Sequence, residues 1–215
     1  MCSDPSPRAP LRPAARRLIL ASGSPARLRL LRDAGFAPDV VVSGIDEGAA
    51  DAPDTASLAL ALAERKALAV ARADGDAVVV GCDSLLDVDG QRFGKPGSDE
   101  EAIRWLRDLR GHTGVLYTGH CLVDEATGRS VSAVEGTTVR FAETNDDELA
   151  AYVATGEATS VAGAFTLDGR SAPFVDHVVG NPSNVIGLSL PLFRKLLAEL
   201  GLAVYELWSQ VGDRG

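Results

Sequence analysis

The chain has 215 residues, of which 46% are hydrophobic and 24% are charged. This mixture is enough to bury a core and is typical of a globular protein rather than a disordered one. The formal net charge of −9 argues against nucleic acid or an anionic membrane as the main partner, because an acidic surface repels both. A chain of this length fits one domain, or two lobes that share a cleft.

The cysteines and the composition of the two ends of the chain predict its cellular location and the bounds of its domain. The cysteines are Cys2, Cys82 and Cys121. They form neither a CxxC pair nor a disulfide framework, so the cytoplasm is the expected location. No apolar run is long enough to span a membrane. Residues 1–15 are rich in Pro, Arg and Ser and predict a disordered leader, ahead of one domain of two lobes over residues 16–208 and a tail over 209–215.

The chain begins with a strand, a tight loop and a helix. Residues 18–21 are an apolar run typical of a short buried strand, and a loop of small residues follows at once. Ser24 is a good N-cap and Pro25 suits the first helical position, so a helix is expected up to Ala34. Gly35 favours the left-handed conformation in which helices often end.

The rest of the chain alternates strands and helices. In the first half we expect a strand at 36–45, a helix at 55–73, a strand at 77–82, a hairpin turn at 89–90 and a capped helix at 98–111. In the second half we expect strands at 115–123 and 129–141, a capped helix at 145–156, short strands within 162–187, a helix at 190–200 and a strand at 203–207. This order predicts an α/β fold with a mixed twisted sheet, helices on both sides and two lobes around a cleft.

The first candidate for chemistry is the loop that contains Ser22, Ser24 and Arg27. Backbone N–H groups at the start of a helix bind anions, and the guanidinium of Arg27 can pair with two phosphate oxygens. The alternative is that Ser24 only caps the helix and that Arg27 is solvated, since the loop is neither a P-loop nor a dinucleotide-binding motif.

The second candidate is Asp83, which follows a valine-rich run. It is expected at the carboxyl end of a buried strand, where open α/β sheets bind ligands. Asp83 could bind a metal or activate water, or it could be an ordinary turn aspartate. Lys66, in an apolar helix, and Lys95, in a rigid turn, are two of only three lysines in the chain. Each can bind a phosphate as a point charge, although a lone lysine usually reaches solvent.

A metal site is expected from oxygen ligands rather than from histidine. Glu47 ends an apolar run and could share a cation with Asp83, and carboxylate and phosphate oxygens favour Mg²⁺ or Mn²⁺. The alternative is that Glu47 is solvated, as most acidic residues at strand ends are. His112, His120 and His177 lack metal-binding spacing, so zinc is not expected.

Six segments carry a resemblance to a known family. They are LILASGSPARLRLL, SGIDE, AERKA, VVVGCDSLLDVDGQRFGKP, YVATGEATSVAGAFTLDG and NVIGLSLP. In this order and spacing, from residue 18 to about residue 201, the chain resembles the Maf family of nucleoside triphosphate pyrophosphatases. That family shares a fold with the inosine-triphosphate pyrophosphatases. The common order of several separate segments is far more specific than any one motif.

The resemblance implies a role for most of the candidate residues. It assigns phosphate binding to Ser22, Ser24, Arg27, Lys66 and Lys95, catalysis to Asp83, and a divalent metal to Glu47 and Asp83. It also implies a nucleoside triphosphate as the substrate and a homodimer as the assembly.

Four positions depart from the family pattern. Relatives that act on dTTP and UTP typically have an arginine, a threonine, a glutamine and a lysine where this chain has Ala26, Ser84, Asp168 and Val161. The family uses the first three of these positions to tell bases apart. The base preference of such relatives therefore does not carry over to this chain, while the phosphate-binding residues are all present.

The expected reaction is hydrolysis of the α–β phosphoanhydride of a nucleoside triphosphate to a monophosphate and pyrophosphate, with non-standard or modified nucleotides among the expected substrates. Asp83 would activate the water, and the cationic side chains would stabilise charge on the phosphates. Two alternatives are a nucleotidyltransferase, which hands the nucleotide to an acceptor, and a non-enzymatic regulator of septum formation.

Overall fold

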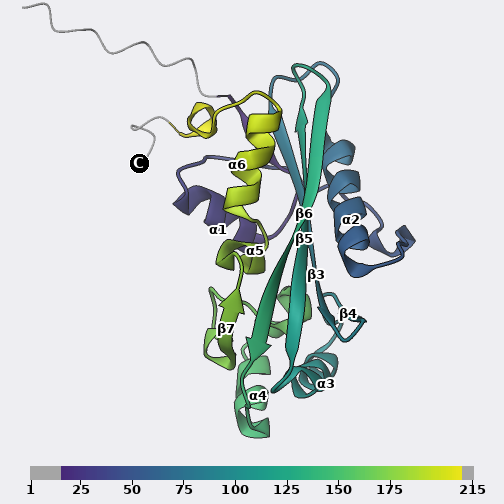
Figure 1. Cartoon of the computed structure of the whole chain (residues 1–215), viewed down its shortest axis with the longest axis vertical. Coiled ribbons are helices and arrows are strands. Elements are labelled where there is room, and N and C mark those ends of the chain that lie inside the picture. Colours follow the sequence, from purple (N-terminus) through teal and green to yellow (C-terminus); the bar gives the residue numbers. More distant parts are fainter. Residues whose placement is uncertain (1–15, 210–215) are drawn as a thin grey trace, which may run out of the picture.

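Residues 16–209 form a seven-stranded sheet with helices against both of its faces in the computed structural model (Figure 1). The strands are β1 (Leu18–Leu20), β2 (Asp39–Val40), β3 (Val78–Val88), β4 (Gln91–Phe93), β5 (Thr113–Asp124), β6 (Arg129–Phe141) and β7 (Val175–Val179). The helices are α1 (Pro25–Asp33), α2 (Thr55–Val70), α3 (Asp99–Leu109), α4 (Asp146–Val153), α5 (Pro182–Ile186) and α6 (Leu190–Glu199). Short 3₁₀ helices are η1 (Glu47–Ala49), η2 (Ala158–Ser160), η3 (Ala162–Ala164), η4 (Ala172–Phe174) and η5 (Val204–Leu207). The predicted leader over 1–15 and residues 210–215 of the predicted tail lie outside the described residues.

The sheet is mixed, as the sequence predicts. Its strands follow the order β2-β1-β3-β5-β6-β7, and β4 pairs with β3 off this path. β1 runs parallel to β2 and β3, whereas β5 is antiparallel to both β3 and β6, and β7 is antiparallel to β6. The long strands β3, β5 and β6 run along the long axis of the molecule in Figure 1. The other elements are arranged around these three strands.

Helix α2 covers one face of the long strands, and α1, α5 and α6 lie on the other side (Figure 1). Successive side chains of a strand point to opposite faces, so β3 contributes to both cores. Val80 packs with Leu31 of α1 and Phe193 of α6 in one core, while Val79 packs with Ala63 of α2 in the other. No helix within residues 16–209 combines the length and the apolar composition needed to cross a bilayer.

The lower end of the long strands in Figure 1 carries β4, α3, α4 and β7. Their apolar side chains form two further clusters with the ends of β3, β5 and β6. Phe93, Leu109 and Phe165 belong to the first cluster, and Leu106 of α3 packs with Leu149 of α4 in the second. Both ends of the molecule are therefore built on the same three strands.

Strand β3 does not stop at Asp83, and the prediction that it does is wrong. It continues to Val88, because β5 pairs with it continuously from Val78 to Asp87. What ends near this point is the neighbouring strand β1, whose last pair with β3 is Leu20↔Val80. Asp83 therefore lies in the middle of a long strand whose β1-facing edge has just become uncovered.

Three further expectations need correction. The strand expected at 36–45 is reduced to β2, because β1 offers only three residues for pairing. The strand expected at 203–207 is the 3₁₀ helix η5, in which the carboxylate of Glu206 accepts the backbone N–H of Ala203 at 2.8 Å. The glycine-rich stretch 162–187 holds one strand, β7, and is otherwise built from the short helices η3, η4 and α5.

The predictions that rest on caps and turns are confirmed. Ser24 caps α1 with Pro25 in its first turn, and Asn145 forms a complete capping box with Glu148 at the start of α4. The hairpin between β3 and β4 turns at residues 89–90, both of which have positive φ, as a two-residue hairpin turn of the favoured kind requires. These signals depend only on residues close together in the chain.

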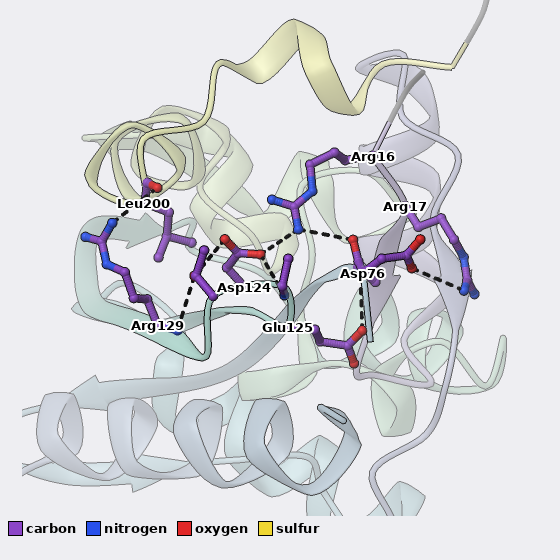
Figure 2. Close-up of polar contacts among 10 residues, drawn as sticks. Arg16, Arg17, Asp76, Asp124, Glu125, Arg129 and Leu200 are labelled. Carbon is purple, nitrogen blue, oxygen red and sulfur yellow. Dashed lines mark hydrogen bonds and ion pairs between the residues drawn. The ribbon is translucent and has the colours of Figure 1, made fainter. Parts of the chain in front are cut away.

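Polar contacts tie the first described residues to the end of the sheet that carries the β5–β6 turn (Figure 2). The guanidinium of Arg16 donates to the carboxylate of Asp124 at 2.5 Å and to the carbonyl of Asp76 at 3.1 Å. The hydrogen bond from Arg16 holds the pKa of the Asp124 carboxyl below its ordinary value. Beside it, Glu125 accepts the backbone N–H of Ala77 at 3.1 Å. This cluster anchors β1 against β3 and β5.

The contact between α2 and the sheet is unusually close, because small residues meet on both sides. Ala59, Ala63 and Ala67 form a stripe along α2, and all three are fully buried. The facing positions on β3 and β5 are Gly81 and Gly119. A Cβ atom built on Gly81 would lie 2.3 Å from the carbonyl oxygen of Ala63 and 2.6 Å from the backbone nitrogen of Ala67. Only glycine therefore permits this spacing.

We predict that Gly81→Ala destabilises the fold. The added methyl group meets helix backbone rather than a flexible side chain, so α2 must move away from the sheet, which typically costs about 1–3 kcal/mol. Urea unfolding at neutral pH measures the loss. The matched control is Gly97→Ala, where the added Cβ would lie 3.3 Å from the end of the flexible Glu101 side chain. Equal unfolding midpoints for the two variants would contradict the prediction.

Candidate active site

A cavity of about 570 Å³ opens where β1 ends, between α1, α2, β3 and the segment that contains η2 and η3. Most residues singled out from the sequence line it, and they are Ser22, Ser24, Ala26, Arg27, Glu47, Lys66, Asp83, Ser84, Lys95 and Val161. Of the predicted site residues, Asp168 alone does not line this cavity. Side chains from six separate places in the sequence thus meet in one cavity.

Asp83 and Ser84 reach the cavity from opposite faces of the sheet. Neighbouring residues of a strand alternate between faces, so Asp83 points toward α2 and Ser84 toward α1 and α5. Their contacts agree, because Asp83 pairs with Lys66 of α2 and Ser84 accepts a hydrogen bond from Arg27 of α1. The cavity therefore wraps around the edge of β3 that β1 leaves uncovered, and the two sides of that edge bear different chemistry.

On the α2 side, Lys66 joins two carboxylates. Its Nζ lies 2.5 Å from Oδ1 of Asp83 and 2.7 Å from Oε1 of Glu47. Lys66 and Asp83 are both 7% exposed, whereas the side chain of Glu47 is 58% exposed. Lys66 occupies a core-facing position of α2, one residue from Ala67 in the small-residue stripe. The close packing of this helix thus delivers its ammonium group to Asp83.

On the α1 side, Arg27 is a buried cation held only by neutral groups. Its Nε donates to the carbonyl of Gly187 at 2.7 Å, Nη1 to Oγ of Ser22 at 3.1 Å and Nη2 to Oγ of Ser84 at 3.0 Å. Within residues 16–209 no carboxylate forms an ion pair with it. A buried charge without a counter-ion is costly, so this site favours an anionic ligand.

Lys95 adds a third cation at the cavity. Partial burial lowers the pKa of the Lys95 ammonium, and the positive charges of Arg27 and Lys66 lower it further. The lining residues thus bring three cations and two carboxylates together. The cavity is locally positive in a chain whose formal net charge is −9. Such a site attracts a small anion while the rest of the surface repels polyanions.

A buried chain of hydrogen bonds supports Ser84, and sequence reasoning missed it. Oγ of Ser84 lies 3.0 Å from Oγ1 of Thr118, and Thr118 in turn donates to the backbone carbonyl of Asn184 at 3.1 Å. Thr118 and Asn184 are fully buried. Thr118 faces Ser84 in the β3–β5 register. The only signal in the sequence was a threonine within an expected strand. Its role as the partner of Ser84 can be recognised only once the β3–β5 register is known.

Asp168 acts at a distance from the cavity. Its carboxylate accepts from Oγ1 of Thr166 at 2.5 Å and pairs with Arg29 of α1, also at 2.5 Å. Burial raises the pKa of the Asp168 carboxyl, but the hydrogen bonds from Thr166 and Arg29 outweigh this and hold it below its ordinary value. Thr166 lines the cavity in its place. Asp168 therefore contacts the cavity wall through Thr166, and its part in base preference stays a prediction.

The two carboxylates fit a divalent metal held jointly with a ligand. Within the described part of the chain, no group of three or more His, Cys, Asp or Glu side chains is arranged to hold an ion. Glu47 and Asp83 nevertheless converge on a single nitrogen of Lys66. Mg²⁺ is commonly bound by one or two carboxylates, with phosphate oxygens and water completing its shell. The donor set is of this kind, and it suits no softer metal.

Comparison with known proteins decides the family. The family model described as Maf-like protein matches residues 17–200. The chain belongs to the Maf family. A nucleoside triphosphate pyrophosphatase of Streptomyces coelicolor is 60% identical over 200 residues, which cover 92% of this chain and 97% of that protein. Proteins of the same name from Streptomyces avermitilis and Gloeothece citriformis are 56% and 48% identical, covering 90% and 88% of this chain and 95% and 97% of those proteins.

Behind the site of this Maf protein, His120 is held in a neutral form. Its Nε2 accepts the backbone N–H of Ser189 at 2.8 Å, and its Nδ1 must donate to the carbonyl of Thr118 at 3.0 Å. A second ring proton would face the Ser189 N–H. Burial, and then the positive charge of Arg27, lower the pKa of His120 from 6.5 to about 4. The ring is a structural link between β5 and the start of α6.

We predict that His120 makes the fold sensitive to mild acid. Below about pH 6.5 the unfolded chain protonates this residue, while the folded chain resists protonation down to about pH 4. The free energy of unfolding therefore falls as the pH drops through this window, by at most about 3 kcal/mol. In urea unfolding, the wild type should lose more stability between pH 7 and pH 5 than the His120→Gln variant does.

The exposed histidine His177 provides the control for this measurement. His177→Gln should retain the wild-type slope of stability against pH, because it leaves the buried ring in place. Parallel pH profiles for the wild type and His120→Gln would show that the buried ring does not resist protonation.

Proposed function

We propose that this Maf protein hydrolyses nucleoside triphosphates to a nucleoside monophosphate and pyrophosphate. The observation that carries the proposal is the buried Arg27, which lacks a carboxylate partner within residues 16–209 and shares its cavity with the Lys66–Asp83 pair. An anion-binding cation beside a buried carboxylate is the arrangement that phosphoanhydride hydrolysis needs. The names of the relatives in both Streptomyces species agree with it.

In this proposal the loop after β1 and three cations bind the triphosphate. Ser22 and Ser24 lie at the start of α1, where the helix dipole favours negative charge. Arg27 supplies the N–H groups that its three protein acceptors leave unused. Lys66 supplies a point charge on the other side of the β3 edge, and Lys95 supplies another from the turn after β4. These groups stabilise the negative charge that grows on the phosphates as the anhydride breaks.

Asp83 is the proposed general base. It accepts a proton from a water whose oxygen attacks the α-phosphorus, and the bond from that phosphorus to the α–β bridging oxygen breaks. The bridging oxygen leaves with pyrophosphate. The hydrogen bond from Lys66 holds and orients the Asp83 carboxylate.

We further propose that Glu47 and Asp83 hold Mg²⁺ or Mn²⁺, whose chemistry when bound is to neutralise phosphate charge and to make water more acidic. Lys66 bridges the same two carboxylates, so it is placed to keep them together, and it would be available to phosphate if they held a cation. The cytoplasmic location and the homodimer stay predictions from the sequence.

The two rival functions are less well supported. A nucleotidyltransferase needs room for an acceptor beside the attacking position, whereas the carboxylate here is buried against α2. A regulator of septum formation without catalytic activity would have no need for three cations around one buried carboxylate. Release of pyrophosphate with water as the sole acceptor distinguishes the proposed hydrolase from both.

We predict that Asp83→Asn reduces turnover by about 10²–10⁴-fold, the usual contribution of a general base. Release of pyrophosphate from a panel of nucleoside triphosphates measures it. Asp87→Asn is the matched control, because Asp87 lies on the same strand but does not line the cavity. Turnover by Asp83→Asn at the rate of the control would remove Asp83 from the mechanism.

We predict that Glu47→Gln weakens Mn²⁺ binding at least about tenfold, since even residues that only support a metal ligand change affinity by about 10- to 100-fold. Titration of Mn²⁺ by electron paramagnetic resonance, without substrate, measures binding independently of activity. Asp51→Asn removes a nearby exposed carboxylate that is outside the cavity and should leave the affinity unchanged. Equal affinities for both variants would refute the role of Glu47.

A further inference from the structure

The hydroxyl groups of the cavity fall into two classes by the direction of their hydrogen bonds. A hydroxyl has one proton to donate and two lone pairs to accept with. Where the partner can only donate, the hydroxyl accepts and keeps its proton for a ligand. Where the partner can only accept, the proton is used and the hydroxyl can only accept from a ligand. The partners in this structure settle the direction for five hydroxyls that line the cavity.

Ser22 and Ser24 retain their protons. Oγ of Ser22 accepts from Nη1 of Arg27 at 3.1 Å and from the backbone N–H of Ser24 at 3.2 Å. Oγ of Ser24 accepts from the backbone N–H of Arg27 at 3.4 Å. Both hydroxyls can therefore donate to a ligand. Donors and a guanidinium together suit the oxygens of a phosphate.

Ser84 has the opposite direction. The backbone carbonyl of Asn184 can only accept, so Thr118 must donate its proton there. Thr118 then has only lone pairs to offer Ser84, and Ser84 must donate to Thr118 across 3.0 Å. The proton of Ser84 is thus committed to the protein interior. One of the two lone pairs of Ser84 accepts from Nη2 of Arg27 at 3.0 Å, so Ser84 can offer a ligand one lone pair and no proton.

Two further hydroxyls share this direction. Thr166 donates to the ionised carboxylate of Asp168 at 2.5 Å, and Arg29 holds that carboxylate in place. Ser160 donates to the backbone carbonyl of Glu157 at 2.8 Å. Ser84, Thr166 and Ser160 are therefore acceptors toward a ligand. We call these three residues the acceptor group.

The acceptor group lies among the apolar walls of the cavity. Ala162 and Phe165 line the same cavity and lie between Ser160 and Thr166 in the chain, and Val185 of α5 lines it as well. The backbone N–H of Gly163 donates to the carbonyl of Gly94 at 2.8 Å, which holds this segment against the β3–β4 hairpin. Apolar walls with a few directed polar groups are typical of a site for a flat organic ring.

We propose that the acceptor group selects nucleobases whose edge carries an exocyclic amino group, namely a 4-aminopyrimidine or a 6-aminopurine, over their carbonyl counterparts. This inference rests on the proposed function and names its substrate class. An amino group offers two N–H donors to lone pairs that the protein leaves unused. A carbonyl oxygen in the same position faces those lone pairs without a proton between them, and the mismatch is costly in a buried site.

The test compares substrates that differ only in this group. We expect kcat/KM for pyrophosphate release to be about 10- to 100-fold higher for CTP than for UTP, and for ATP than for ITP, as for a mismatched buried hydrogen bond. Equal rates, or faster hydrolysis of UTP and ITP, would overturn the inference and leave the proposed function standing. Hydrolysis of none of the four would instead reject the proposed function itself.

Thr118 provides a test that does not touch the ligand. Thr118→Val removes the acceptor of the Ser84 proton, so Ser84 becomes able to donate to a carbonyl, and the CTP-to-UTP ratio should fall at least about fivefold. Thr118→Ser keeps the hydroxyl and should keep the ratio. An unchanged ratio in Thr118→Val would contradict the proposed direction of Ser84.

A second pair of variants covers the case in which Thr118→Val does not fold. Thr166→Val removes one member of the acceptor group, and it should lower kcat/KM for CTP more than for UTP through a higher KM. Thr166→Ser retains the donor to Asp168 and should behave as the wild type. Equal losses for both substrates would show that Thr166 does not read the base.

Discussion

The close approach of α2 to β3 and β5 is the constraint on which the site depends. Gly81 and Gly119 leave no side chain between the sheet and the alanine stripe of α2, so helix backbone lies almost against strand backbone. At this spacing Lys66, in a core-facing position, places its ammonium group 2.5 Å from Asp83. The close packing of α2 thus buries the carboxylate of Asp83 and pairs it with the ammonium group of Lys66. The same ammonium group lies 2.7 Å from Glu47.

The second determinant is the early end of β1. Because β1 has only three residues, the edge of β3 is open from Gly81 to Leu85, where β4 has not yet begun to pair with it, and ligand-binding groups can reach this edge from both faces. The α2 face contributes carboxylates and a lysine. The α1 face contributes Arg27, which is held by neutral oxygens alone. The carboxylates and Lys66 therefore lie on one side of β3 and Arg27 on the other, and the two sides meet at its open edge.

Electrostatics and hydrogen-bond direction explain how an acidic protein can choose a small anion. The chain as a whole is negative, but three cations line the cavity. Their local field attracts phosphates despite the repulsion from the rest of the protein. Hydrogen-bond direction then adds a finer level of choice. Ser22 and Ser24 keep their protons, whereas the partners of Ser84 and Thr166 take theirs. A hydroxyl group thus serves a ligand as donor or as acceptor according to the protein group to which it is already hydrogen-bonded.

The sequence alone determined most of the local structure and the members of the site. The caps at Ser24 and Asn145 and the turn at 89–90 depend on residues within a few positions, and all are present. Pairing between distant segments could not be read in this way, so the sequence placed Asp83 at a strand end when β5 continues the strand past it. Nor could it show that Asp168 pairs with Arg29 of α1. Only the tertiary structure decided these contacts, because a side chain's partner and the direction of its hydrogen bond depend on which distant segments the fold brings beside it.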